Sequence, residues 1–485
     1  MITFAVCLIL LVGGYFVYGK FVDRIFGPDD RKTPAEASRD GVDYVPLPTW
    51  KIFLIQFLNI AGLGPIFGAV LGAMYGPVVF LWITFGTIFI GAVHDYFSGM
   101  ISERHNGTSL PDLIGIYLGR PVKILMRVLI VILMVMVGTV FVNGPSNILA
   151  GLTDNAFGGL MDLNFWIVVI FIYFLVACIF PIDKIIGNLY PIFGFALLFM
   201  AVALFFMLIF NAGDMPELRG DTFRNMHPNA GKMHLFPMMF ITVACGAVSG
   251  FHATQSPMMA RCIRKETEGR KIFYGAMVAE GIVALIWAAA AMTFFGSIGS
   301  FQESVLAVGN NASVIVDKIA HGWLGKFGAV LALLGVVAAP ITSADTAFRS
   351  CRLIIAEALN ISQKSFWNRV WLSLPLFAVS VILLQINFDI IWRYFAFTNQ
   401  TLAAFTLWAV TVYLYRRHKP WIITLIPAIF MTVVCSTYIL CAPEGLRLPL
   451  QTSVGIGLAF AACCTGLFFW LRHQENKTTN QYSTL

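Results

Sequence analysis

Long apolar runs alternate with short polar segments along almost the whole chain. Most runs are about 20 residues long, and a helix of that length spans the roughly 30 Å hydrocarbon core of a bilayer. Thirteen runs can be marked, at residues 1–19, 52–75, 77–100, 123–143, 164–180, 186–210, 236–258, 272–298, 326–348, 366–386, 390–415, 420–440 and 449–471. The pattern predicts an all-α polytopic membrane protein with about 13 transmembrane helices.

The composition agrees with this fold class. Hydrophobic residues make up 58% of the 485 residues, and charged residues make up only 12%, whereas soluble domains carry about 25% charged residues. The net charge of +7 does not indicate a nucleic acid partner, because basic residues of membrane proteins gather in cytoplasmic loops. The nine cysteines lie mainly in apolar runs, without metal-ligand spacing, so we interpret them as small buried hydrophobic residues.

The placement of Lys and Arg predicts the orientation of the chain. With the N-terminus outside, most of the 32 basic residues fall in cytoplasmic loops, as the positive-inside rule requires. We expect a multi-pass protein of the bacterial cytoplasmic (inner) membrane, with the N-terminus outside and the C-terminus inside. No basic segment precedes the first apolar run, so we expect that run to be a retained helix and not a cleaved signal peptide.

The second run is interrupted near its middle by Gly62, Gly64 and a proline. In a helix interior, Gly costs about 1 kcal/mol and Pro about 3 kcal/mol relative to Ala. Irregular backbone at membrane depth is tolerated only where it is packed in protein or lines a wet cavity. A simple kink with close helix packing is the alternative. The binding hypothesis places Asn59, Gly62, Gly64 and Phe67 around a substrate.

The seventh run carries a similar interruption between Cys245 and Pro257. Hydrogen-bonding side chains are frequent there, although lipid-facing positions should be apolar. A lone buried histidine is more often a structural residue than a ligand group, but a histidine grouped with polar neighbours and broken backbone indicates binding. The candidate substrate-binding residues in this run are Ser249, Gly250, Phe251, His252, Thr254 and Gln255.

The two interrupted runs are five spans apart, so they cross the membrane in opposite directions. Paired interruptions in two halves of a chain are typical of transporters built from inverted repeats. We therefore predict a five-plus-five inverted repeat with broken first and sixth core helices. The predicted parts are a peripheral N-terminal helix and cytoplasmic loop (1–51), the first repeat (52–210), an extracellular loop (211–235), the second repeat (236–415), and two C-terminal helices with a cytoplasmic tail (416–485).

Further polar groups lie at membrane depth. Thr342, Ser343 and Asp345 in the ninth run can coordinate a cation or pass a proton. An Asp345–Arg349 pair that anchors the helix at the interface is an equally good interpretation. A third polar cluster, at Thr398 to Gln400, is a candidate for facing the cavity.

Three ionisable residues stand out in other runs, namely His94, Asp95 and Glu280. Ionisable side chains within membrane spans are costly and are usually functional, so proton coupling is one hypothesis. Buried pairing with an arginine is the other.

Enzyme signatures are absent from the sequence. There is no P-loop, which argues against ATP-driven transport by this chain. No His/Cys cluster has metal-ligand spacing, and no Ser/His/Asp arrangement stands out. We expect no catalytic residues and no metal site beyond a sodium ion.

Several segments resemble the carbon starvation protein A family. They are GPIFGAVLGAMYGP at 64–77, GAVHDYFSGM at 91–100, SERHNGTSLP at 102–111, GFHATQS at 250–256 and ITSADTAFR at 341–349. The resemblance runs continuously from about residue 60 to residue 350, and this chain resembles a short member without a long C-terminal extension.

The resemblance implies a secondary transporter of the amino acid, polyamine and organocation superfamily, which works by alternating access. Family activities imply uptake of pyruvate, related carboxylates or short peptides, driven by protons. In the superfamily, hydroxyls at the positions of Thr342 and Ser343 complete a sodium site, with carbonyls of the first break near Ala61. The coupling ion is thus a proton or sodium, with no other cofactor.

The predicted partners are a small-molecule substrate and the lipid bilayer, with the oligomeric state left open. One alternative function is a membrane nutrient receptor that binds the same ligands without net transport. A passive channel is disfavoured because the interruptions indicate an occluded site.

Overall fold

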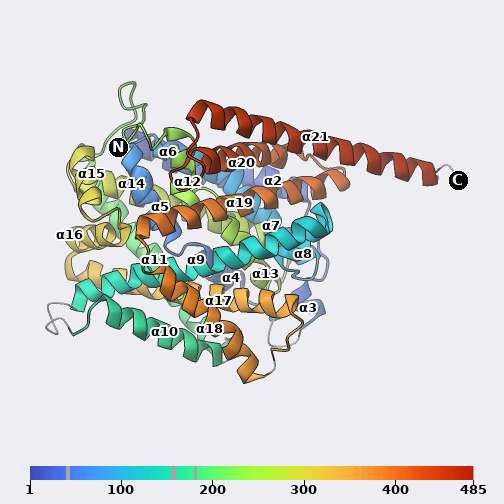
Figure 1. Cartoon of the computed structure of the whole chain (residues 1–485), viewed down its shortest axis with the longest axis horizontal. Coiled ribbons are helices and arrows are strands. Elements are labelled where there is room, and N and C mark those ends of the chain that lie inside the picture. Colours follow the sequence, from blue (N-terminus) through green and yellow to red (C-terminus); the bar gives the residue numbers. More distant parts are fainter. Residues whose placement is uncertain (40–43, 154–159, 180–182, 364, 484–485) are drawn as a thin grey trace.

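The chain folds as a bundle of helices that run roughly alongside one another, with the two termini at opposite ends (Figure 1). The computed structural model describes residues 1–39, 44–153, 160–179, 183–363 and 365–483. Every regular element in these ranges is a helix. Helix α21, at the C-terminal end, projects beyond the body of the bundle (Figure 1).

The N-terminal helices are α1 (Ile2–Phe16), α2 (Tyr18–Phe26) and α3 (Pro34–Ala37). The first half of the bundle follows them, with the helices α4 (Thr49–Ile60), α5 (Gly64–Gly72), η1 (Ala73–Tyr75), α6 (Val79–Leu81), η2 (Trp82–Gly91), α7 (Ala92–Arg104), α8 (Leu110–Leu118), α9 (Arg120–Thr153), α10 (Leu163–Ile179) and α11 (Asp183–Phe210).

The second half begins after a loop that contains η3 (Ala212–Asp214). Its helices are η4 (Leu235–Met239), α12 (Phe240–Val243), η5 (Ala244–Gly246), α13 (Gly250–Ala260), η6 (Glu266–Glu268), η7 (Arg270–Tyr274), α14 (Gly275–Phe294), α15 (Ile298–Ala307), α16 (Ala312–Ala332), η8 (Leu333–Ala338), α17 (Ala339–Ala358), α18 (Phe366–Leu383), α19 (Phe388–Arg416), α20 (Ile422–Cys441) and α21 (Leu450–Ser483).

The predicted apolar runs fall on these helices, but α9 continues to Thr153 and α17 to Ala358, past the predicted ends at residues 143 and 348. Within the described residues, nine helices and one bent helix pair are long and apolar enough to cross a membrane. The three remaining runs lie on α10, on η8 with α17, and on α19. The all-α membrane fold class is therefore confirmed.

Two further segments differ from the prediction. The first helix does not end at residue 19 but continues through α2, where Val22 and Phe26 are buried while Lys20 and Arg24 are exposed. Its last turns are thus amphipathic, and a search for apolar runs misses such a pattern. Between the eighth and ninth runs, the chain forms α15 and the start of α16, which are too polar for a membrane span.

Each half of the bundle begins with a broken helix. The axes of Thr49–Ile60 and Gly64–Tyr75 differ by 48°, and the second broken helix is interrupted between Val243 and Gly250. The two breaks lie side by side, because α5 packs against α12 and η5, and α4 packs against α13.

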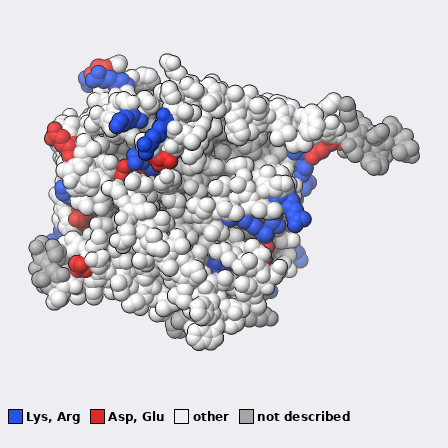
Figure 2. Space-filling view, in the orientation of Figure 1, with Lys and Arg blue, Asp and Glu red and all other residues white. Residues whose placement is uncertain are grey.

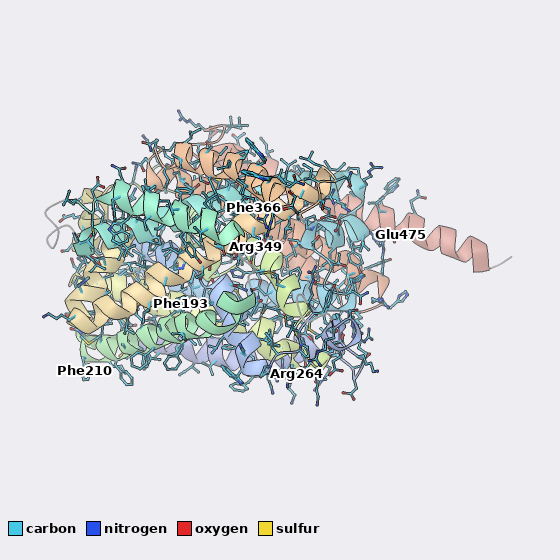
Figure 3. The ribbon with its side chains drawn as sticks, turned by 90° about the horizontal axis from the view of Figure 1, so that it is seen from below. Phe193, Phe210, Arg264, Arg349, Phe366 and Glu475 are labelled. Atoms are coloured by element: carbon cyan, nitrogen blue, oxygen red, sulfur yellow. The ribbon has the colours of Figure 1, made fainter. Side chains whose placement is uncertain are left out.

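Charged side chains gather toward the two ends of the bundle, and the middle of the visible face is mostly uncharged (Figure 2). After a quarter turn, Arg264 and Glu475 lie toward one end and Phe210 lies at the other (Figure 3). This distribution fits helices that cross a bilayer.

Candidate functional site

The first break is a short stretch of irregular backbone between α4 and α5. Helix α4 ends at Ile60, and α5 begins at Gly64 with Pro65 in its first turn, where a missing N–H costs no hydrogen bond. Ala61 and Gly62 lie in the break itself. A Cβ on Gly62 would lie 2.6 Å from the Phe141 ring, so this glycine permits close packing against α9.

The second break is shorter than the sequence predicts. Irregular backbone is confined to residues 244–249, and Ala244 has the left-handed backbone angles φ 41° and ψ −118°. A non-glycine residue with positive φ is strained, and such strain is often found at functional sites. The predicted interruption reached Pro257, but Pro257 lies inside α13. Hence Gly250, Phe251, His252, Thr254 and Gln255 occupy the first turns of a regular helix.

Helix α19 holds the second break in place. The side-chain oxygen of Asn399 accepts hydrogen bonds from the Phe251 N–H at 2.7 Å and from the Ser249 hydroxyl at 3.2 Å. Gln400 donates to the Val248 carbonyl at 2.9 Å. Asn399 therefore caps the N-terminus of α13, so one free N–H that the break creates is already satisfied. The polar cluster at 398–400 thus supports the broken helix.

Small residues bring the two breaks into direct contact. A Cβ on Gly64 would lie 2.3 Å from the Cys245 Cβ, and one on Gly68 would lie 2.3 Å from the Val243 carbonyl oxygen. Both glycines therefore allow one backbone to approach the other more closely than any larger residue would. Nearby, Phe67 packs against Phe388 and Trp392.

Buried polar atoms without a hydrogen-bond partner surround the contact between the breaks. Within the described part of the chain they include Gln56 Oε1, Asn59 Oδ1 and Gln255 Oε1. The amide nitrogen of Gln56 reaches the Ser256 hydroxyl at 3.5 Å, which links α4 to α13. Unpaired buried polar atoms are rare in proteins, so these atoms are available to a polar ligand. Sequence reasoning missed Gln56, although its spacing of three residues from Asn59 places both on one helix face.

Four fully buried ionisable side chains form one cluster next to α13, the helix that follows the second break. Asp95 on α7 contacts the Nδ1 atoms of His94 and His252, each at 2.8 Å. On the opposite side of its ring, His252 Nε2 lies 3.3 Å from Glu280 Oε2 on α14. The predicted residues His94, Asp95, His252 and Glu280 are therefore brought together, and none of them pairs with an arginine in the described structure.

This cluster has unused hydrogen-bonding capacity. Both carboxyl oxygens of Glu280 and the Nε2 atoms of His94 and His252 lack a hydrogen bond within the described residues. The cluster contains two carboxyl groups and two imidazoles, so it can hold a variable number of protons. Among the described residues, no group of three or more His, Cys, Asp or Glu side chains is arranged to hold a metal ion.

One hydroxyl of the ninth run reaches the first broken helix. Ser343 is 3.5 Å from the Leu58 carbonyl oxygen of α4, and it also donates to the Ala339 carbonyl of its own helix, as Thr342 does. Asp345 instead lies 3.7 Å from Arg349, in the i,i+4 pair that was one of the two interpretations. The geometry thus connects Ser343, but not Asp345, with the first broken helix.

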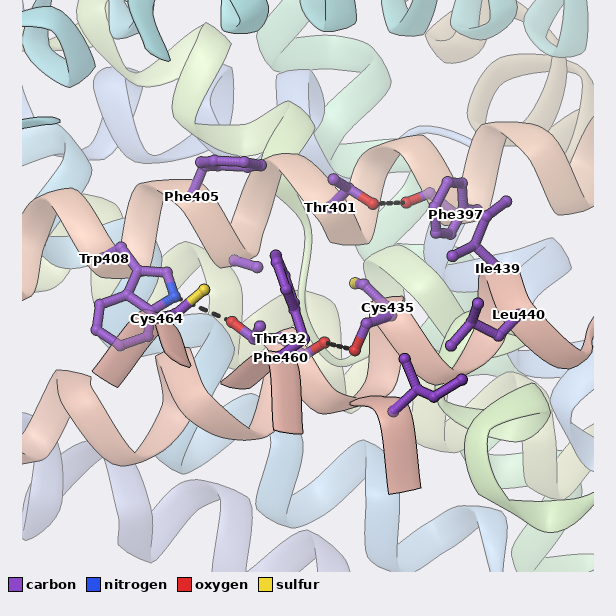
Figure 4. Close-up of a pocket in the computed structure, with 13 residues that line it drawn as sticks. Phe397, Thr401, Phe405, Trp408, Thr432, Cys435, Ile439, Leu440, Phe460 and Cys464 are labelled. Atoms are coloured by element: carbon purple, nitrogen blue, oxygen red, sulfur yellow. Dashed lines mark hydrogen bonds between the residues drawn. The ribbon is translucent and has the colours of Figure 1, made fainter. Parts of the chain in front are cut away.

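A large apolar pocket of about 440 Å³ lies elsewhere, between α19, α20 and α21 (Figure 4). Its few polar groups are used within the helices and between them: Trp408 donates to the Thr432 hydroxyl at 2.9 Å, and Thr401 donates to the Phe397 carbonyl at 2.9 Å. This pocket contains no residue of either break. Its apolar lining on peripheral helices fits lipid contact better than a polar substrate.

Comparison with known proteins identifies related sequences. The model of the family described as carbon starvation protein CstA matches residues 1–164, 159–321 and 288–438. The pyruvate/proton symporter BtsT of Escherichia coli is 30% identical over 314 residues, which cover 53% of this chain and 43% of that protein. The peptide transporter CstA of Bacillus subtilis is 30% identical over 361 residues, 62% of this chain and 60% of that protein. The chain thus spans about half the length of these curated transporters.

Solved structures share the fold at low sequence identity. MhsT in complex with L-phenylalanine superposes with a TM-score of 0.55 at 14% identity, covering 86% of this chain and 99% of that one. A sodium-coupled sialic acid symporter gives a TM-score of 0.52 at 16% identity, with 95% of each chain covered. These likenesses show the fold alone, which is the transporter fold of two inverted five-helix repeats with broken first and sixth core helices.

Proposed function

Because the chain belongs to the carbon starvation protein CstA family, we propose that it is a proton-coupled secondary transporter that imports a small carboxylate such as pyruvate, or a short peptide. Transport proceeds by alternating access in the bacterial inner membrane, with the N-terminus outside. The observation that carries this proposal is the contact between two broken helices beside a buried cluster of four ionisable side chains.

Substrate binding is assigned to the polar atoms around the two breaks. Asn59 and Gln255 offer unpaired amide oxygens in the described structure, which suit the hydroxyl or N–H donors of a substrate. A substrate carboxylate is favoured by the positive ends of the helix dipoles at the N-termini of α5 and α13. Part of the backbone N–H groups there is already used, because those of Ile66 and Phe67 donate to the Leu63 carbonyl and that of Phe251 donates to Asn399.

Coupling is assigned to the cluster of His94, Asp95, His252 and Glu280. Its groups lie on three different helices, α7, α13 and α14, and Cys245 of the second break is a further neighbour of His252. A rearrangement of the broken helix moves His252 relative to both carboxyl groups. Since a buried charge is stable only when it is paired, such a movement changes how many protons the cluster holds.

The test is uptake of labelled pyruvate and dipeptides into proteoliposomes under an imposed pH gradient. Glu280→Gln and His252→Gln remove one titrating group each while they retain hydrogen-bonding capacity. We expect both variants to lose uptake driven by the pH gradient, and Glu280→Gln to retain substrate exchange. Glu357→Gln, which changes an exposed carboxylate, is the matched control.

Unchanged gradient dependence in both cluster variants would assign coupling elsewhere. The sodium alternative is tested with Thr342→Ala/Ser343→Ala, which removes the two hydroxyls that were predicted to complete a sodium site. Uptake by the parent protein that depends on sodium and not on the pH gradient, and that is lost in this variant, would contradict the cluster proposal. Substrate binding without counterflow in the parent protein would support the nutrient receptor instead.

A further inference from the structure

A second polar site lies outside the transport pathway, where α8 meets the first turns of α9. It is a pocket of about 630 Å³ lined by Asp112 and Ile116 of α8 and by Arg120, Lys123, Ile124 and Arg127 of α9. Figure 2 shows basic side chains gathered on this part of the visible face, over the ends of α8 and α9. Neither break of the core helices contributes to its lining.

The lining carries an excess of positive charge. Asp112 is its one carboxylate and pairs with Lys123, while Arg127 lies 3.7 Å from Asp112 and 3.3 Å from Glu357. Arg120 is exposed and has no carboxylate partner among the described residues. The three cations of the lining thus face one carboxylate within it and Glu357 beside it, which leaves a net positive charge.

The position of these cations on their helix is unfavourable without an anion. Arg120 and Lys123 lie in the first turn of α9, and that turn contains no acidic residue. The N-terminus of a helix carries a partial positive charge, so cations there are repelled and an anion is favoured.

An exposed apolar stripe leads away from the pocket along α9. Ile124 is 54% exposed, Val128 54% and Ile132 45%, and a spacing of four residues places all three on one face of the helix. Ile116 of α8, 48% exposed, flanks the same face. A basic pocket continuous with an apolar stripe matches the two parts of a phospholipid, the charged headgroup and the acyl chain.

We propose that this pocket binds an anionic phospholipid, with the headgroup phosphate at Arg120, Lys123 and Arg127 and an acyl chain along Ile124, Val128 and Ile132. The headgroup lies in a pocket and the acyl chain contacts an apolar stripe, so the lipid is held at one position. This differs from the general attraction of anionic lipids to basic loops. The bound lipid joins α8 to α9 at the end of the bundle that carries most of the basic residues.

The experiment measures the melting temperature of the full chain in a neutral detergent during titration with phosphatidylglycerol. Phosphatidylcholine with the same acyl chains and inorganic phosphate are titrated in parallel. We expect phosphatidylglycerol alone to raise the melting temperature, because ligand binding to the folded state stabilises it. In Arg120→Gln/Lys123→Gln, the apparent dissociation constant should rise by roughly tenfold or more.

Lys20→Gln/Lys271→Gln removes the same charge from two exposed lysines outside the pocket and should bind like the parent protein. The single variant Arg120→Gln, which breaks no described ion pair, serves if the double variant is unstable. Equal phosphatidylglycerol binding by the parent and both pocket variants would overturn the proposal. An equal shift with phosphate would assign the site to a free anion and would overturn the lipid assignment.

Discussion

His252 lies between two carboxyl groups, and all three side chains are completely buried. The sequence marked each of these residues as notable, but it separated them into a substrate group and a coupling group. Their contact depends on the packing of α7 against α13 and α14, which lie far from α7 in the sequence. The alternative hypothesis paired these residues with an arginine. In the described structure Asp95 instead pairs with His94 and His252, and Glu280 pairs with His252.

His227, in the loop between the two halves, leads us to predict that the stability of the protein depends on pH. Burial lowers the pKa of His227 from its ordinary 6.5 to about 4. Its Nδ1 accepts from the Asn229 N–H at 3.0 Å, and its ring lies 4.9 Å from the Tyr75 ring. Between pH 6.5 and 4 the unfolded loop binds a proton that the folded loop does not, so its stability falls as the pH falls through this window.

Thermal unfolding measured from pH 7.5 to pH 4 checks this prediction. His227→Gln should be less stable than the parent at pH 7.5 and should lose less stability on acidification. His234→Gln, at the N-cap of η4 in the same region, should retain the parent profile. Parallel profiles of the parent and His227→Gln would show that His227 does not contribute.

The broken helices are the elements that define the site, and their contact depends on glycine. We predict that Gly68→Ala destabilises the protein by about 1–3 kcal/mol, because its Cβ would meet the Val243 carbonyl oxygen at 2.3 Å and the backbones would have to separate. Uptake should be lost together with this contact. Melting temperature and uptake of the purified variant provide the measurement.

Gly466→Ala is the matched control for this prediction. Gly466 lies on α21, and a Cβ at this position would meet no atom within 4 Å. Since Ala favours a helix over Gly by about 1 kcal/mol, this variant should be at least as stable as the parent. Equal stability of the two variants would show that the breaks do not need the close approach.

At the scale of the whole molecule, one buried carboxylate joins segments from several parts of the chain. Glu266 accepts from the Asp29 N–H at 2.7 Å and from Arg104 Nε at 2.6 Å, and Arg104 also donates to the Gly27 carbonyl at 2.9 Å. These contacts hold the segment after α2 against α7 and η6.

We predict that Glu266→Gln loosens the segment after α2. The variant leaves Arg104 without its buried counter-ion, and breaking such a pair costs about 3–5 kcal/mol. Backbone hydrogen exchange of residues 27–33 should become faster, because their contacts with η6 depend on this carboxylate. The control is Glu268→Gln, two residues away and less buried. Unchanged hydrogen exchange of residues 27–33 in Glu266→Gln would show that Glu266 does not hold this segment.

The sequence by itself determined the helical membrane fold and the positions of the two breaks. Apolar runs of sufficient length require helices in a bilayer, whatever their neighbours are. Gly62, Gly64 and Pro65 each weaken a helix, so the sequence alone located the first break, which falls between α4 and α5. The second was placed less accurately, because Pro257 is accommodated inside α13 while the irregular backbone lies at 244–249.

Only the tertiary structure decided which side chains meet. Three hydrogen bonds depend on how distant helices pack. Asn399 caps α13, Gln56 contacts Ser256, and Asp95 contacts His252. A run of apolar residues gives no information about which face of a helix contacts which neighbour when nearly all faces are apolar. The hydrophobic pattern therefore fixes the spans, whereas close packing at the glycines and pairing of buried polar groups fix the site.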